Sequence, residues 1–211
     1  MSFPGATIEA ADRAVARVDG SASLGAFLDP GCSAAVWSRQ TPSKVQSWLD
    51  GLDPALLPCG RVVLGSNAVA RTVGHLFDLA GMPVGSERDW LQRDIVDLAE
   101  VFADLMQVKY LRLRLDAVTT NACRKFHVDA ITARLVCTYR GTGTQYGFST
   151  NGSDPGRLFT VQTGAPILLR GTLWPSEPAS GLLHRSPPIE GSGETRLVLV
   201  LDPIFELTDE E

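Results

Sequence analysis

The segment CRKFHVDAITARLVCTYRGTGTQY, residues 123–146, holds the residues on which the fold and the chemistry of this chain depend. His127 and Asp129 stand two residues apart, directly before a run over 131–140 that is typical of a strand. In an extended chain, side chains two residues apart point to the same side. His127 and Asp129 are therefore either half of a metal site or an ordinary hydrogen-bonded polar pair at the entrance to a strand.

A third ligand would have to come from another strand, and His184 in GLLHRSPP is the candidate. Two imidazoles and one carboxylate on one face of a barrel form the facial triad of non-haem Fe(II) enzymes, which leaves coordination positions open for substrate, co-substrate and oxygen. The same ligands with one water also suit zinc. We therefore expect Fe(II) or Zn(II), held by His127, Asp129 and His184. The alternative for His184 is a surface or capping histidine.

Arg196 begins the last strongly apolar segment, TRLVLVLD, and would share one strand face with Val198 and Val200. A guanidinium there could bind the far carboxylate of a chelating 2-oxo acid such as 2-oxoglutarate through two parallel hydrogen bonds. The competing interpretation is a surface ion pair with Glu194.

Four further residues near the His127–Asp129 pair are weaker candidates. Arg134, Thr138 and Tyr139 follow on the next strand, but the turn after Asp129 leaves open which of them face the barrel interior. Lys125 precedes His127, as a substrate contact or as part of a solvated strand edge. We keep Tyr139, Arg134 and Lys125 as pocket candidates.

The periodicity of the apolar residues changes once along the chain. Before residue 108 it is mostly helical: a stripe at Ile8, Ala11, Val15 and Val18 predicts a helix, SAAVWSR (33–39) a short edge strand, and 87–107 the clearest helix. From 108 the period is two, and six or so short strands separated by turns predict a β-sandwich or barrel. We expect an α+β fold in a single domain over 1–211, with a mainly helical bracing region (1–107) and a β-barrel carrying the site (108–211).

Composition excludes several classes of protein. With 44% hydrophobic and 20% charged residues the chain is neither disordered nor collagen-like. A net charge of −5 argues against nucleic acid or an anionic membrane as the main partner. The first residues, MSFPGATIEAADRAVARVDG, carry acidic side chains where a signal peptide would need an uninterrupted apolar core, so we expect none. No run approaches the length of a membrane span, and the four cysteines form no CxxC pair, so we expect reduced thiols in a cytoplasmic protein.

The residues also carry a resemblance. FHVDAITARLVCTYRGTGTQY, VQTGAPILLRG, LHRSPP and ETRLVLVLD resemble DUF1826, a bacterial family of uncharacterised proteins. The order of the elements is similar to the double-stranded β-helix (cupin or jelly-roll barrel) of 2-oxoglutarate/Fe(II) oxygenases. The resemblance implies N-terminal helices packed on a C-terminal barrel of this kind, with the metal ligands and the 2-oxoglutarate-binding arginine at the positions given above. One position departs from the oxygenase pattern, because Val198 stands where a Ser or Thr usually follows the arginine.

Three functions follow from these observations. The first is an Fe(II)/2-oxoglutarate-type oxygenase of unknown substrate. The second is a non-enzymatic zinc-binding protein of metal homeostasis, since genes of the resembling family sometimes neighbour zinc-homeostasis genes. The third is a metal-free relative that acts on a protein partner through its helical half.

Overall fold

A computed structural model describes residues 14–121, 123–149, 153–175 and 181–206. Its helices are α2 (Ser43–Gly51), α3 (Val69–Leu79) and α4 (Ser86–Met106), with 3-10 segments η1 (Ser21–Leu28), η2 (Pro54–Leu56) and η3 (Ser66–Ala68). Its strands are β1 (Val15–Val18), β2 (Ala34–Trp37), β3 (Gly60–Gly65), β4 (Tyr110–Val118), β5 (Ala133–Arg140), β6 (Gln145–Phe148), β7 (Phe159–Thr160), β8 (Pro166–Arg170), β9 (Leu182–Arg185) and β10 (Arg196–Ile204).

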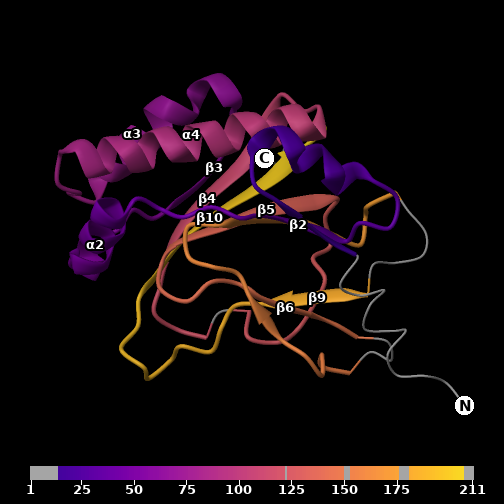
Figure 1. The fold of residues 1–211 in the computed structure, drawn as a ribbon. Coiled ribbons are helices and arrows are strands. Elements are labelled where there is room, and N and C mark those ends of the chain that lie inside the picture. Colours follow the sequence, from indigo (N-terminus) through magenta and orange to yellow (C-terminus); the bar gives the residue numbers. More distant parts are fainter. Residues whose placement is uncertain (1–13, 122, 150–152, 176–180, 207–211) are drawn as a thin grey trace, which may run out of the picture.

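The strands form two sheets. The large sheet has seven strands in the order β1-β2-β8-β5-β10-β4-β3, and the small sheet has three in the order β7-β6-β9. In Figure 1, β6 and β9 lie across from the large sheet, and the helices cover its other side. This mixed α and β architecture, with two facing sheets, leaves an interior between the sheets in which a site can form.

Alternation along the strands divides the large sheet into two faces. On β4, Leu111, Leu113 and Leu115 are buried in the core cluster that includes the helices, whereas Arg112 and Arg114 point the other way. On β10 both faces are covered, so every residue of the strand is buried. Its leucines join the helical core, and its valines join a second apolar cluster that contains residues from both sheets.

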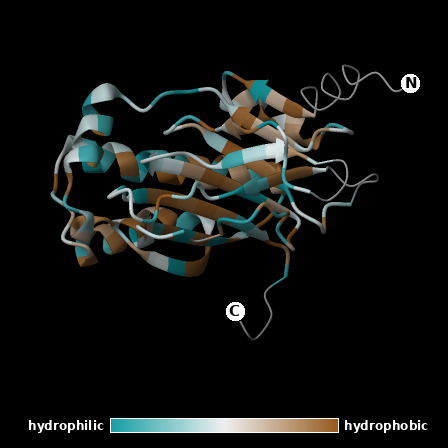
Figure 2. Cartoon of the chain, turned by 90° about the horizontal axis from the view of Figure 1, so that it is seen from below, coloured by the Kyte–Doolittle hydropathy of each residue, from teal (hydrophilic) through white to brown (hydrophobic). Residues whose placement is uncertain are grey.

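Helix α4 supplies most of the helical side of the core. Its apolar residues recur at spacings of four and three, and the stripe is fully buried at Leu91, Ile95, Leu98 and Phe102. The helix ends at Met106, and the C-cap residue Gln107 adopts the left-handed conformation with φ 55°. In Figure 2 the brown apolar segments run along the sheet strands and alternate with teal hydrophilic ones.

The first 107 residues differ from the expected bracing region, because they contribute β1, β2 and β3 to the large sheet as well as the helices. The helix predicted from Ile8 to Val18 is wrong over its described part, where Val15–Val18 is a strand paired in parallel with β2; Ile8 and Ala11 lie outside the described residues. SAAVWSR does contain a strand, but β2 lies between β1 and β8 and is not at the edge. All four cysteines are free thiols. Within the described residues, no helix combines the length and apolar character needed to cross a membrane.

Candidate metal centre

His127 and His184 are brought side by side by the backbone. The amide of His127 donates to the carbonyl of His184 at 3.1 Å, and the amide of His184 donates back at 3.0 Å, so the two residues form an isolated antiparallel bridge beside β9. Their imidazole rings are 4.5 Å apart between centroids. Asp129 follows on the same side of the chain as His127. One ligand atom from each of the three residues lies within 4.8 Å of the others, so the group can hold a metal ion.

The hydrogen bond of His127 sets which nitrogen is available to a metal. Its Nδ1 lies 2.8 Å from the carbonyl oxygen of Lys125, an acceptor, so Nδ1 carries the proton and Nε2 keeps its lone pair. That Nε2 faces Asp129 at 3.4 Å from Oδ1. A histidine that binds a metal through one ring nitrogen commonly donates the N–H of its other ring nitrogen to a backbone carbonyl, a carboxylate or water. Lys125 therefore contributes its carbonyl group, while its side chain is exposed.

The carboxylate of Asp129 lies among cationic and imidazole groups. Arg134 Nη1 is 2.8 Å from Asp129 Oδ2, and His184 Nε2 is 3.0 Å from the same oxygen. Burial by itself would raise the pKa of Asp129, but the close approach of His184 and the charges of His184, Arg134 and His127 lower it to about 2. The carboxylate is therefore ionised at neutral pH, as a metal ligand must be.

The donor set fits a divalent transition metal. Asp129 Oδ2 is buried and, despite its close neighbours, makes no hydrogen bond of good geometry. It thus has lone pairs to offer, and His184 is buried beside it. Two imidazole nitrogens and one carboxylate are the ligands of facial-triad iron sites, and they also suit zinc.

Arg134 connects the ligand to the large sheet. Its Nε and Nη2 donate to the two carboxylate oxygens of Asp202 on β10 at 2.7 and 2.8 Å, while Nη1 reaches Asp129. Because a carboxylate pairs with the guanidinium on each side, Arg134 is held in a single orientation. It therefore orients the Asp129 carboxylate. The Arg134 side chain lines the cavity beside the two histidines.

A cavity of about 120 Å³ extends from the histidines between the two sheets. Its apolar wall consists of Val136, Val198 and Val200, which belong to β5 and β10. Arg114 and Asp116 of β4 form part of its lining and lie 2.9 Å apart, Nε to Oδ2. Sequence reasoning missed both of them, although they alternate with the buried leucines of that strand. The alternation of these two residues with the leucines indicated only that they lie on the solvated face of the strand.

Arg196 is the largest fully buried side chain among the described residues, at 2% exposure. Its Nε donates to the Thr142 carbonyl at 2.6 Å, and its Nη2 donates to Thr138 Oγ1 at 3.2 Å. Burial lowers the pKa of Arg196 to about 10, partly offset by the charge of Glu194. The guanidinium therefore remains charged at neutral pH. The acceptors recorded for it in the described part of the chain are uncharged.

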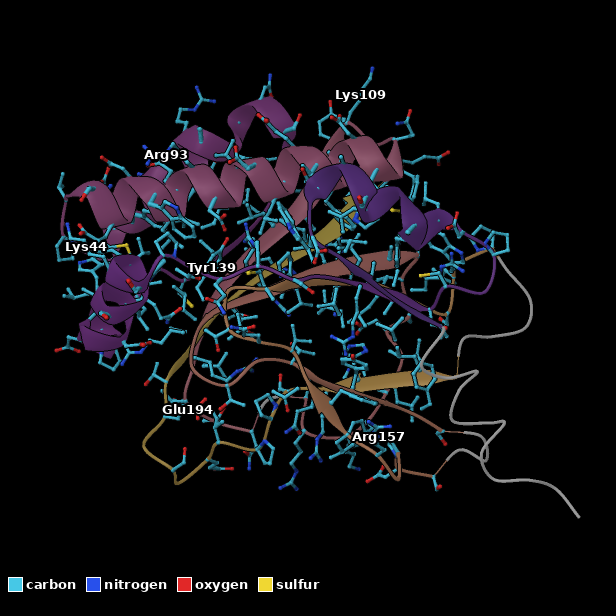
Figure 3. The ribbon with its side chains drawn as sticks, viewed as in Figure 1. Lys44, Arg93, Lys109, Tyr139, Arg157 and Glu194 are labelled. Atoms are coloured by element: carbon cyan, nitrogen blue, oxygen red, sulfur yellow. The ribbon has the colours of Figure 1, made fainter. Side chains whose placement is uncertain are left out.

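The surface ion pair with Glu194, the competing interpretation for Arg196, is absent from the described residues. The Glu194 carboxylate instead accepts from the amide and the hydroxyl of Thr142, at 2.6 and 3.0 Å. In Figure 3, Glu194 lies on the loop before β10, on the side of the large sheet opposite to the helices.

Tyr139 does not line the cavity, which corrects the expectation from the sequence. It is five residues from Arg134 and therefore points to the opposite face of β5. Its hydroxyl donates to Asp94 of α4 at 2.6 Å, and Arg39 donates to both oxygens of that carboxylate at 2.6 and 2.7 Å. Burial raises the pKa of the Tyr139 hydroxyl. Figure 3 places Tyr139 between the helices and the sheet.

Comparison with solved structures supports the fold. The dioxygenase for auxin oxidation 1 from Arabidopsis thaliana, in its binary complex with 2-oxoglutarate, matches with a TM-score of 0.51 at 11% identity, covering 92% of this chain and 93% of that one. The corresponding rice dioxygenase matches with a TM-score of 0.46 at 13% identity over 93% and 86% of the two chains. A 2OG-Fe(II) oxygenase family oxidoreductase from Burkholderia pseudomallei gives 0.43 at 13% over 92% and 98%. At these identities the first likeness shows a shared jelly-roll fold.

Sequence comparison gives the family. No curated protein sequence matches the chain. The family DUF1826, described as a protein of unknown function, matches residues 19–202. Because that match covers most of the chain, and because the motifs around His127, His184 and Arg196 lie within it, the protein belongs to the DUF1826 family.

Proposed function

We propose that this protein is an oxygenase of the Fe(II)/2-oxoglutarate type, in which His127, Asp129 and His184 hold the metal and Arg196 binds the co-substrate. The observation that carries the proposal is the convergence of two imidazoles and one carboxylate at the end of a cavity that also contains a buried guanidinium. That guanidinium has only uncharged acceptors among the described residues. A carboxylate from a ligand would supply the missing counter-charge.

His127, Asp129 and His184 would hold Fe(II), and a set of three protein ligands leaves coordination positions for other ligands. When bound, Fe(II) supplies the redox chemistry that couples oxidative decarboxylation of 2-oxoglutarate to oxidation of a substrate. The chain supplies binding and orientation. Arg134 holds the Asp129 carboxylate in one orientation, and the Lys125 carbonyl fixes the tautomer of His127.

The remaining residues of the cavity control access and charge. Val136, Val198 and Val200 form an apolar wall that limits water beside the metal ligands. Arg196 lies in the same cavity, where its charge can orient a dicarboxylic 2-oxo acid with the 2-oxo group toward the histidines. The substrate itself is not specified by these contacts.

Metal content is the first test. The chain, reconstituted anaerobically with Fe(II) and analysed for elements, is expected to hold about one iron. The His127→Ala/Asp129→Ala variant is expected to hold none, because two of three ligands are gone. His75→Ala is the matched control, since His75 is the one other histidine of the chain and lies exposed on α3. Stoichiometric iron in the double variant would refute the ligand assignment.

Arg196→Met tests the co-substrate assignment. The substitution removes a buried charge and keeps a similar stem, so the metal-free variant is expected to be at least as stable as the wild type. Its affinity for 2-oxoglutarate, measured by anaerobic calorimetry on the iron-loaded chain, is expected to fall about 10- to 100-fold. A bound metal with no response to 2-oxoglutarate in the wild type would refute the oxygenase and favour a metal-handling role.

A further inference from the structure

A second cavity, of about 220 Å³, lies where β1, at the edge of the large sheet, meets β6 and β7 of the small sheet. In the described part of the chain it shares no lining residue with the cavity at the metal centre. Its walls are two arginines, three aromatic side chains and one valine, which are Arg17, Arg157, Tyr146, Phe148, Phe159 and Val15. Cations and aromatic rings around one concave space suit a ligand that joins an anionic group to a planar ring.

The alternation of side chains along β1 directs Arg17 into this cavity. Ala16 and Val18 pack on the core cluster that includes the helices, whereas Val15 packs on the apolar cluster between the sheets. Arg17 is two residues from Val15 and therefore points the same way. Its Nη2 donates to the hydroxyl of Tyr146 on β6 at 3.2 Å. This uncharged oxygen is the only partner of Arg17 among the described residues, so no carboxylate there balances its charge.

Arg157 brings a second positive charge to the same cavity from the segment before β7. Its guanidinium carbon lies 4.7 Å from the centroid of the Phe159 ring, a cation–π contact that holds the charge beside the aromatic wall. The segment packs closely on β6, because a Cβ at Gly147 would lie 2.5 Å from the Arg157 carbonyl oxygen. Figure 3 shows Arg157 on the small-sheet side of the molecule, away from the helices. Two cations that line one cavity repel each other, and an anion between them would relieve that repulsion.

The aromatic side chains form an apolar wall next to the two cations. Tyr146 and Phe159 are stacked, with ring centroids 5.3 Å apart and planes inclined by 19°. Tyr146 is 3% exposed, whereas Phe148 and Phe159 are half-buried and keep part of their ring surface accessible. A planar group that covered this surface would remove it from water. Tyr146 is opposite His184 in the register of β6 with β9, so the wall adjoins the candidate metal centre.

We infer that this cavity binds a small planar aromatic carboxylate, with Arg17 and Arg157 on the carboxylate and the phenylalanine rings against the ligand ring. The inference goes beyond the proposed function and does not depend on it, because neither the metal ligands nor Arg196 take part. Arg17 is the side chain that distinguishes an anion from a neutral ligand. The Tyr146 hydroxyl orients its guanidinium and leaves further N–H donors for the carboxylate oxygens.

Binding of 1-naphthoate to the metal-free chain tests the inference, by calorimetry with EDTA present so that no metal takes the carboxylate. The wild type is expected to bind 1-naphthoate saturably and at least about 10-fold more tightly than 1-naphthamide, which has the same ring without the charge. Acetate, which has the charge without the ring, is expected to bind at least about 10-fold more weakly as well. Arg17→Met is expected to raise the Kd for 1-naphthoate about 10-fold and to keep that for 1-naphthamide within about 3-fold of wild type.

Two further variants complete the test. Arg157→Met removes the second cation from an independent segment and is expected to raise the Kd for 1-naphthoate about 10-fold, so it carries the same test if Arg17→Met does not fold. Arg93→Met is the matched control, since Arg93 is an exposed arginine of α4 on the helical side of the molecule (Figure 3). Its Kd is expected to stay within about 2-fold of wild type.

The inference would be overturned by equal Kd values for 1-naphthoate and 1-naphthamide in the wild type, or by the absence of saturable 1-naphthoate binding. An unchanged Kd for 1-naphthoate in Arg17→Met would overturn it too, as would a loss in Arg93→Met as large as that in Arg17→Met. All of these measurements use the metal-free chain. Their outcomes are therefore separate from those of the metal and 2-oxoglutarate experiments that test the proposed function.

Discussion

Arg134→Met should destabilise the metal-free protein, because Arg134 is the cation that two buried carboxylates share. The guanidinium makes two hydrogen bonds to Asp202, at 2.7 and 2.8 Å, and one contact with Asp129 at 2.8 Å. The side chains of Arg134, Asp129 and Asp202 are 18%, 16% and 8% exposed. The substitution leaves both carboxylates without this partner in a poorly solvated place.

The expected loss is about 3 kcal/mol. Removing one partner of a buried ion pair typically costs about 3–5 kcal/mol, because the other charge remains buried. The lower end applies here, since Arg112 of β4 is opposite Asp202 in the sheet register and can offset part of its charge. For a chain of this length about 3 kcal/mol corresponds to a fall in Tm of roughly 6–12 °C.

A double-mutant cycle separates the ion pair from lost packing. Urea unfolding is measured for wild type, Arg134→Met, Asp202→Asn and the double variant, all without metal. Because Asp202→Asn removes the carboxylate that Arg134→Met would leave unpaired, the double variant is expected to recover about 2 kcal/mol relative to the sum of the single effects. Metal affinity should fall about 10- to 100-fold in Arg134→Met, since the Asp129 ligand loses its orientation.

The reasoning would be refuted by a coupling energy near zero. In that case the loss in Arg134→Met would come from side-chain packing alone, and Arg134 would have no role in holding the Asp129 ligand. Unchanged metal affinity together with a normal coupling energy would limit the role of Arg134 to the stability of the sheet.

Three further perturbations test other parts of the structure. Tyr139→Phe removes a hydrogen bond to the Asp94 carboxylate and should cost about 1.5–3 kcal/mol in urea unfolding, with metal content unchanged. The folded pKa of Asp129 is depressed from 3.8 to about 2, so the stability it contributes is present above pH 3.8 and is lost as pH falls through about 2. Asp129→Asn should therefore reduce the acid dependence of metal-free stability by about 1 kcal/mol after solvent screening, measured by unfolding at several pH values. In Gly171→Ala a Cβ would lie 1.9 Å from the Ile131 carbonyl oxygen and 2.8 Å from that of Asp129, so iron content by elemental analysis should drop.

Helices and strands in which the apolar pattern repeats several times could be predicted from the sequence. The stripe of α4 and the alternating leucines of β4 each repeat several times, and their burial follows the expected faces. The four residues of β1 gave no such repetition. Val15 and Val18 fit a helical spacing by chance, while their strand conformation depends on parallel pairing with β2, which is a tertiary contact.

The site could be predicted in part because its residues follow strand parity. The side chains of His127 and Asp129 lie together, and Arg196 and Val198 line the same cavity, as alternation along a strand requires. The alternation of side chains cannot be followed across the turn after Asp129, so the sequence alone admits both Arg134 and Tyr139 to the pocket. Only the pairing of β5 with β8 and β10 decides that Arg134 faces the cavity and Tyr139 faces α4.

The register of β10 against β5 then links the fold to the proposed chemistry. In a sheet, a shift of one residue moves every side chain of a strand to the other face. The leucines of β10 fill the helical core and the valines line the interior between the sheets, so a slip would bury polar groups in both places. The apolar demand of the core therefore fixes which residues of β5 lie beside Arg196. Within that fixed register the irregularity at Leu197 and Val198 brings Thr138 opposite Val198, so the placement of a hydroxyl beside the guanidinium follows from packing on the far side of the same sheet.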